Sequence, residues 1–113
     1  MLFKRKEKKK SKKTEQRELD EAWKKNVKER DGYICQICKK KLEGRSCHAH
    51  HILPKRTKGM RWDLQNGITL CANHHKLGIF SAHQNAIWFT FWLKTNKSNQ
   101  FKYIINKLEH MKQ

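Results

Sequence analysis

Three cysteines and one histidine in this chain have the spacing that suits a single metal ion, and this limits the fold more than any other feature. Cys35 and Cys38 form a Cys-x-x-Cys pair, and Cys71 and His74 repeat the same interval later in the chain. Two such half-sites together suit one tetrahedral structural Zn²⁺. A chain of 113 residues buries a smaller share of its surface than a longer chain does, so a metal staple would supplement its small hydrophobic core.

Other uses of the cysteines are open at this stage. Four cysteines also permit two disulfides, but the Cys-x-x-Cys pair and the seven histidines favour metal binding over oxidation. Cys47 is a rival to His74 as the fourth zinc ligand. His74 is favoured because its interval from Cys71 mirrors that from Cys35 to Cys38. The prediction is a Cys3His zinc site made of Cys35, Cys38, Cys71 and His74.

The charge balance indicates a polyanionic partner. The formal net charge is +17, from 27 basic and 10 acidic residues. A surplus of that size in a small protein is self-repelling unless a polyanion such as a nucleic acid neutralises it. The lysine run at 4–13 has almost no apolar residue, so residues 1–13 are predicted to be a disordered basic arm. Its role is either that of a solubilising tail or that of a tether that seeks phosphates.

Hydrophobic patterning predicts no membrane partner. Residues 1–13 contain no apolar stretch of the kind that begins a secretory signal peptide. The longest apolar run, residues 86–93, is far shorter than the roughly 20 residues that cross a bilayer. The expected location is therefore intracellular and cytoplasmic.

Apolar spacing before and within the metal-binding region predicts one helix and two strands. Leu19, Trp23 and Val27 recur at helical intervals, which predicts a helix over 14–31. Residues 46–53 and 67–70 each predict a short strand. A second helix is expected to begin near Ala72 or Asn73 and to carry the histidines that follow.

The C-terminal part of the chain is predicted to close the domain with two helices. Residues 86–93 are aromatic and apolar, and apolar residues repeat at helical spacing from Phe101 to Leu108. The polar segment 95–100 is expected to be the turn between the two helices. Core packing is the favoured role of the aromatic side chains, although Trp88 or Trp92 would stack on a nucleic-acid base if exposed.

The order of the histidines around the zinc half-sites resembles the HNH endonuclease family. A pair, His50-His51, precedes Asn66, and His75 directly follows the second half-site. The resemblance extends over residues 32–93, and segments 61–67 and 81–83 are similar to a phage and bacterial subgroup. It implies an α+β fold, a small zinc-stapled ββα-metal core with flanking N- and C-terminal helices. After the arm at 1–13, residues 14–113 would form the nuclease domain, with the N-terminal helix at 14–31, the core at 32–85 and the C-terminal helices at 86–113.

The resemblance also implies a role for each residue of the pattern. His51 would be the general base and His50 a ligand of a catalytic metal ion, and strand alternation supports this division because neighbouring side chains point apart. His75 would be the second ligand. Asn66 would tie the strands together through hydrogen bonds to the loop that carries His51, although an Asn-Gly turn is its ordinary role.

Three further histidines complete the predicted assignments. The segment Ser81-Ala82-His83 resembles the one that supplies the third metal ligand in the subgroup, so His83 is expected to take that role. A surface histidine that caps the following helix is the alternative. His48 and His110 are expected to be surface residues.

The activity that the resemblance implies is metal-dependent hydrolysis of DNA phosphodiester bonds, by nicking or double-strand cutting, in a bacterium or a phage-infected host. The DNA would be duplex or branched, and charge alone does not exclude RNA. An all-histidine site is softer than the carboxylate-rich sites that suit Mg²⁺, so Mn²⁺, Ni²⁺, Co²⁺ and Zn²⁺ are candidates besides Mg²⁺, and no small-molecule cofactor is expected. The alternative is a non-catalytic, zinc-stapled DNA-binding or recombination accessory protein. Phosphates would be gripped by the basic residues of one loop, Lys55, Arg56, Lys58 and Arg61.

Overall fold

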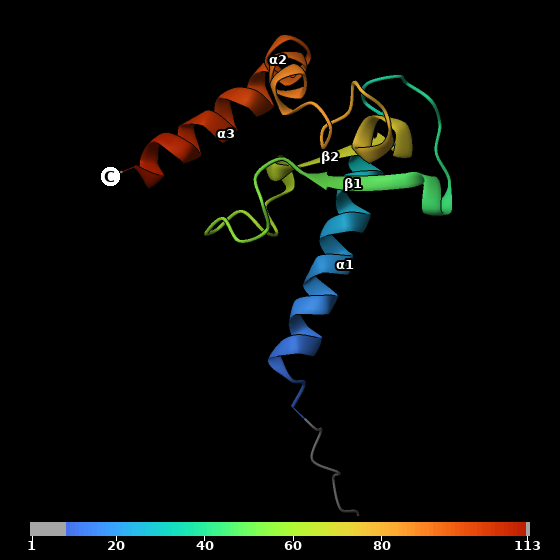
Figure 1. Cartoon of the computed structure of the whole chain (residues 1–113). Coiled ribbons are helices and arrows are strands. Elements are labelled where there is room, and N and C mark those ends of the chain that lie inside the picture. Colours follow the sequence, from blue (N-terminus) through green and yellow to red (C-terminus); the bar gives the residue numbers. More distant parts are fainter. Residues whose placement is uncertain (1–8, 113) are drawn as a thin grey trace, which may run out of the picture.

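A computed structural model describes residues 9–112, which fold as a two-stranded antiparallel sheet with helices around it. Figure 1 shows α1 extending away from the sheet and α2 and α3 lying on another side of it. The predicted α+β class with flanking helices is confirmed. The elements in chain order are α1 (Lys12–Arg30), β1 (Cys47–His51), β2 (Gly67–Cys71), the π-helical turn η3 (Asn73–Leu77), α2 (Ala86–Asn96) and α3 (Ser98–Met111).

Helix α1 begins where a serine can cap it. The Ser11 hydroxyl accepts a hydrogen bond from the backbone N–H of Thr14 at 3.1 Å, which satisfies one of the free amide groups of the first turn. Because of this cap the helix starts at Lys12, so the last two residues of the arm predicted at 1–13 are helical. Residues 1–8 of that arm lie outside the described residues.

The end of α1 is joined to β2 by a buried carboxylate. Asp31 follows the last helical residue, and its carboxylate accepts a hydrogen bond from the backbone N–H of Thr69 at 2.9 Å. Arg30 donates to Asp31 at 3.0 Å and to the carbonyl of Gly67 at 2.7 Å. These bonds position α1 along the sheet, and its buried residues Trp23 and Val27 contact that surface.

Alternation along β1 places the predicted base, His51, and the predicted metal ligand, His50, on opposite faces of the sheet. Cys47 pairs with Cys71, and His51 pairs with Gly67. Because side chains alternate along a strand, His51 faces α1 while His50 faces α2. Ring contacts agree with this division: His51 stacks on Trp23 of α1, and His50 makes an edge contact with Phe89 of α2.

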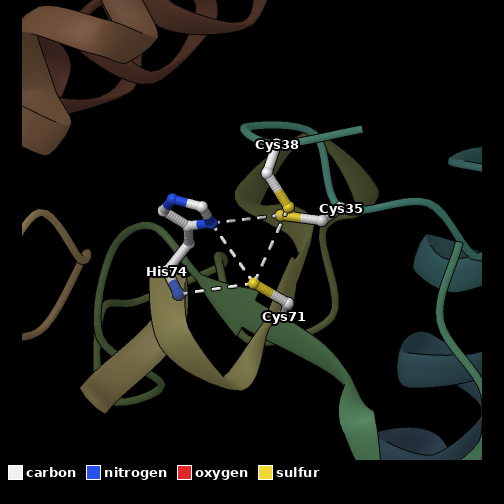
Figure 2. Close-up of side chains that lie close together, drawn as sticks. All are labelled: Cys35, Cys38, Cys71 and His74. Atoms are coloured by element: carbon white, nitrogen blue, oxygen red, sulfur yellow. Dashed lines mark hydrogen bonds between the residues drawn. The ribbon is translucent and has the colours of Figure 1, made fainter. Parts of the chain in front are cut away.

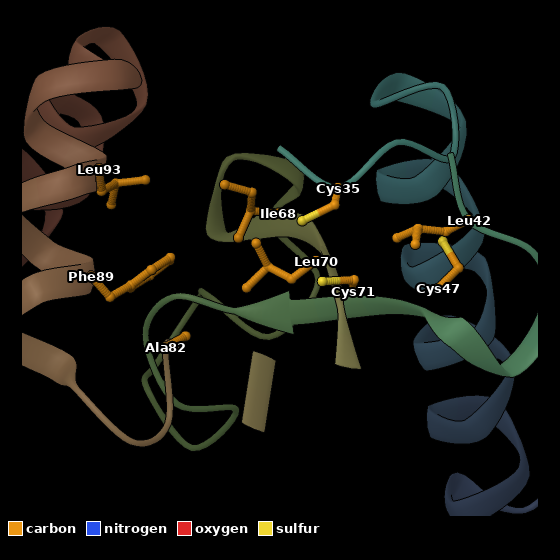
Figure 3. Close-up of a cluster of buried hydrophobic side chains, with 9 residues drawn as sticks. All are labelled: Cys35, Leu42, Cys47, Ile68, Leu70, Cys71, Ala82, Phe89 and Leu93. Atoms are coloured by element: carbon orange, nitrogen blue, oxygen red, sulfur yellow. The ribbon is translucent and has the colours of Figure 1, made fainter. Parts of the chain in front are cut away.

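Strand β2 is the centre of the hydrophobic core. All of its residues are buried, and Figure 3 shows Phe89 and Leu93 of α2 facing Ile68 and Leu70 of the strand. Burial of these apolar side chains is the main force that holds α2 against the sheet. No helix among residues 9–112 is long and apolar enough to cross a membrane.

The junction between α2 and α3 is shorter than predicted. The polar segment 95–100 was expected to be a turn, but α2 continues to Asn96 and α3 starts at Ser98, so Lys97 alone separates them. Thr95 lies within α2, and its hydroxyl donates to the carbonyl of Phe91 at 2.9 Å in the same helix. Lys97 donates from Nζ to the side chain of Gln36 at 2.7 Å, which anchors the junction to the metal-binding region.

Gly67 is required for close packing between β2 and α1. A Cβ atom at this position would lie 2.5 Å from Cγ2 of Val27 and 2.6 Å from Cζ2 of Trp23. We expect Gly67→Ala to lower the free energy of unfolding by about 1–3 kcal/mol, because neither buried side chain can move freely. Denaturant titration followed by circular dichroism measures this change. Combining it with Val27→Ala removes one of the two clashes, so the double variant should lose less stability than the sum of the two single losses.

Candidate metal centres and active site

The three cysteines and the histidine predicted to bind zinc lie together. Their ligand atoms are all within 4.8 Å of one another, and Figure 2 shows them converging. The Nδ1 atom of His74 is 3.2 Å from Sγ of Cys71, and Sγ of Cys38 is 3.9 Å from Sγ of Cys71. Two sulfur ligands of one tetrahedral Zn²⁺ are about 3.8 Å apart, so the distance between Cys38 and Cys71 fits such an ion.

Local backbone geometry brings these four ligands together. Between Cys35 and Cys38 the chain turns tightly, since the backbone N–H of Lys39 donates to the carbonyl of Cys35 at 2.8 Å. Lys39 has a φ of 64°, a left-handed conformation that lets the turn close. Cys71 ends β2, and His74 lies in the first part of η3.

Cys47, the rival zinc ligand, is not part of this cluster. It is 4% exposed and lies in the hydrophobic core. Burial raises the pKa of its thiol, so the group stays protonated and packs as a small apolar side chain. Of the two candidates for the fourth ligand, the structure brings His74 to the other cysteines and leaves Cys47 apart.

A second cluster consists of the three histidines predicted to hold a catalytic metal ion. His50, His75 and His83 each offer a ring nitrogen, and these atoms also lie within 4.8 Å of one another. The Nε2 atoms of His75 and His83 are 3.1 Å apart. The rings come from β1, from η3 and from the segment before α2, which is attached by a hydrogen bond from the N–H of His83 to the carbonyl of His75 at 3.0 Å.

The environment keeps these imidazoles neutral. Burial, followed by the charges of the two neighbouring histidines, lowers the pKa of His50 to about 3. Burial also lowers the pKa of His75 to about 4 and lowers that of His83. A histidine must be neutral to donate a lone pair to a metal ion, so the cluster is in its ligand form at neutral pH.

His51 is held in a fixed orientation with one ring nitrogen free. Its Nε2 donates to the carbonyl of Arg61 at 2.9 Å, and its ring stacks on Trp23 with centroids 3.8 Å apart. A carbonyl only accepts, so Nε2 carries the proton and Nδ1 has the lone pair. Nδ1 has no hydrogen-bond partner among residues 9–112. Burial lowers the pKa of His51, so the ring is a neutral base able to accept a proton from water.

Asn66 makes the hydrogen bonds expected of it. Its side-chain oxygen accepts from the N–H of Leu53 at 2.7 Å, and its amide nitrogen donates to the carbonyls of Leu53 and Met60, each at 3.0 Å. The residue is 0% exposed. Asn66 therefore closes both ends of the loop that follows His51, and this loop supplies the carbonyl that orients the imidazole.

The four basic residues predicted to grip phosphates are not equivalent. Lys55, Arg56 and Lys58 are exposed on the loop. The guanidinium of Arg61 instead forms two short bonds to the carboxylate of Asp20 in α1, at 2.8 Å and 2.7 Å. Those bonds lower the pKa of Asp20 to about 2. Arg61 thus braces the loop against α1, and its charge is already paired.

A cleft of about 690 Å³ opens beside the three-histidine cluster and His51. One wall is apolar and belongs to α2 and α3, while charged side chains from α1, the loop and η3 lie along the other side. The cleft is also lined by the four histidines named above, and His51 can reach it from the other face because it is the last residue of β1. The charged residues that line it are Lys24, Lys55 and Lys76.

The sequence analysis did not identify one histidine that contacts the three-histidine cluster. His48 was expected to be a surface residue, but its Nδ1 lies 2.7 Å from Nδ1 of His75. The available signal was strand alternation, which puts His48 on the same face as His50, two positions away. His110 is exposed near the end of α3, as expected.

Comparison with known families agrees with this geometry. The sequence model of the HNH endonuclease family matches residues 35–87, a segment that contains both clusters, His51 and Asn66. The match supports the resemblance seen in the sequence, and it indicates a nuclease-type function with divalent metal ions. No curated protein and no solved structure gives a significant match to the chain.

Removing the Asn66 side chain should destabilise the protein. We expect Asn66→Ala to lower the free energy of unfolding by about 2–4 kcal/mol, because it leaves a buried N–H and two carbonyls without partners. Denaturant titration measures the loss. The matched control is Asn106→Ala on the exposed face of α3, where alanine should be neutral or slightly stabilising. Equal stability of the two variants would contradict the structural role of Asn66.

Proposed function

We propose that this protein is a metal-dependent endonuclease that hydrolyses DNA phosphodiester bonds, with His51 as the general base. One observation carries the proposal: an oriented, neutral imidazole with a free Nδ1 faces the same cleft as three histidines that fit one metal ion. The match of residues 35–87 to the HNH endonuclease family supports the same reaction class.

Each cluster suits a different kind of metal ion. Three thiolate-forming cysteines and one imidazole suit a structural Zn²⁺, with no ligand position left for a substrate. His50, His75 and His83 provide three nitrogen ligands, which suit one divalent ion such as Mn²⁺, Ni²⁺, Co²⁺, Zn²⁺ or Mg²⁺. When bound there, that ion supplies positive charge that stabilises the phosphate oxygens and the leaving oxygen.

In this mechanism His51 accepts the proton of the attacking water. Nδ1 of His51 accepts a proton as the water oxygen bonds to phosphorus, and the bond from phosphorus to the leaving oxygen breaks. The leaving oxygen then takes a proton from solvent. The Arg61 carbonyl stabilises the imidazolium, because Nε2–H remains hydrogen-bonded to it throughout.

Binding of DNA would rest on the exposed cations. Lys55, Arg56 and Lys58 lie on the loop beside His51, and the formal net charge of +17 favours a polyanion over the whole surface. Phosphate contacts of this kind carry no base information, so substrate choice would depend on the shape of the DNA.

His51→Ala should strongly slow cleavage while it leaves metal and DNA binding intact. Loss of the base should reduce the rate by about 100- to 10,000-fold. Nicking of supercoiled plasmid measures the rate across a panel of divalent metal ions, and gel shift measures binding. His110→Ala is the control, because that histidine is exposed near the end of α3. Undiminished cleavage by His51→Ala would remove His51 from the mechanism, whereas an inactive parent protein that binds DNA would favour an accessory binding role.

Zinc content separates the two candidate ligand sets. Cys38→Ser should lose the structural Zn²⁺ and much of the folded structure, because folding and zinc binding are coupled in small domains. Cys47→Ala should keep one tightly bound Zn²⁺, since Cys47 lies outside the cluster. Metal analysis by mass spectrometry after gel filtration, together with circular dichroism, checks both. Loss of zinc from Cys47→Ala would contradict the Cys3His assignment, and retention of zinc in Cys38→Ser would contradict any zinc site that uses the Cys-x-x-Cys pair.

A further inference from the structure

We propose that His48 is a positioning residue that holds the ring of His75 in its metal-binding orientation and tautomer. This inference rests on the proposed role of His50, His75 and His83 as ligands of one ion. It goes beyond that role because it assigns a task to a histidine that none of the ligand positions requires.

Two successive contacts connect the carbonyl of Arg45, the ring of His48 and the ring of His75. Nε2 of His48 is 2.9 Å from the carbonyl of Arg45, and Nδ1 of His48 is 2.7 Å from Nδ1 of His75. The rings of His48 and His75 meet edge to face, with an angle of 86° between their planes. The other nitrogen of His75, Nε2, is the one that lies 3.1 Å from Nε2 of His83.

The positions of the ring protons follow from the contact between His48 and the Arg45 carbonyl. Because the Arg45 carbonyl only accepts, Nε2 of His48 carries the proton, and Nδ1 of the neutral ring is then an acceptor. The short contact to His75 therefore requires Nδ1 of His75 to donate. That leaves the lone pair of His75 on Nε2, the nitrogen that lies 3.1 Å from Nε2 of His83.

His48 should act on one ligand of the three. Among residues 9–112, neither His50 nor His83 has a hydrogen-bond partner at its second ring nitrogen, whereas Nδ1 of His75 donates to Nδ1 of His48. An outer partner of this kind fixes ring orientation and raises the basicity of the ligand nitrogen. His48 can take this role because it lies two residues before His50 on β1, on the same face of the strand.

Metal titration of two variants tests the proposal. His48→Leu removes the acceptor, whereas His48→Asn keeps a side-chain oxygen near the position of Nδ1. Binding of Co²⁺ to protein that retains its structural zinc is followed by calorimetry and by the visible absorption of the bound ion. We expect about 10- to 100-fold weaker binding and an altered spectrum for His48→Leu, with most of the affinity restored in His48→Asn. His110→Leu should match the parent protein.

A measurement on the unaltered protein keeps the test independent of any folding defect. Two-bond proton–nitrogen correlation spectra of the zinc-loaded protein should show the Nε2–H tautomer for His48 and the Nδ1–H tautomer for His75. The reverse tautomers, or a His48→Leu variant that binds Co²⁺ as tightly as the parent, would overturn the role of His48. A parent protein that binds no second ion at all would instead overturn the proposed three-histidine metal site.

Discussion

The convergence of Cys35, Cys38, Cys71 and His74 is the constraint on which the rest of the structure depends. This cluster joins the turn after α1 to the end of β2 and the start of η3, three segments that are otherwise connected by a small core. The next residue after His74 is His75, a member of the second cluster. A ligand set that fixes the backbone of η3 therefore also fixes one corner of the candidate active site, across a single peptide bond.

The positive charges near the cleft also help to keep its histidines neutral. Burial is the main reason for the lowered pKa values of His50, His75 and His83, and the charge of Lys76 acts in the same direction on each of them. Lys55 contributes similarly at His51. Cations near the cleft thus favour both a bound polyanion and imidazoles that keep their lone pairs.

Features that depend on short intervals were accessible from sequence. The cysteine spacing, the helical repeat of Trp23 and Val27, and the alternation of His50 and His51 are local patterns, and the structure contains all of them. The contacts of Asn66 were also anticipated, although from family resemblance. These predictions succeed because the geometry of a turn, a helix or a strand is set by neighbouring residues.

Features that depend on distant pairing were not accessible. Arg61 carries the same charge as its neighbours, and nothing in its own segment reveals that Asp20 occupies its guanidinium. His48 shares a strand face with His50, but its partner His75 belongs to another element, so only the folded backbone brings them together. The junction at Lys97 was mispredicted because the polar residues around it are compatible with both a helix and a turn.

The loop between His51 and Arg61 has two attachments that concern the same ring. The side chain of Asn66 forms hydrogen bonds with the backbone of Leu53 and Met60, which lie near the two ends of the loop. The Arg61 carbonyl accepts a hydrogen bond from the imidazole of His51. The exposed cations proposed to touch phosphate lie on this same stretch of backbone. A DNA strand that distorted this loop would also turn the imidazole of His51 away from the attacking water. Only a substrate that fits the undisturbed loop would meet His51 in its catalytic orientation. Recognition of DNA shape and catalysis would therefore depend on the same loop.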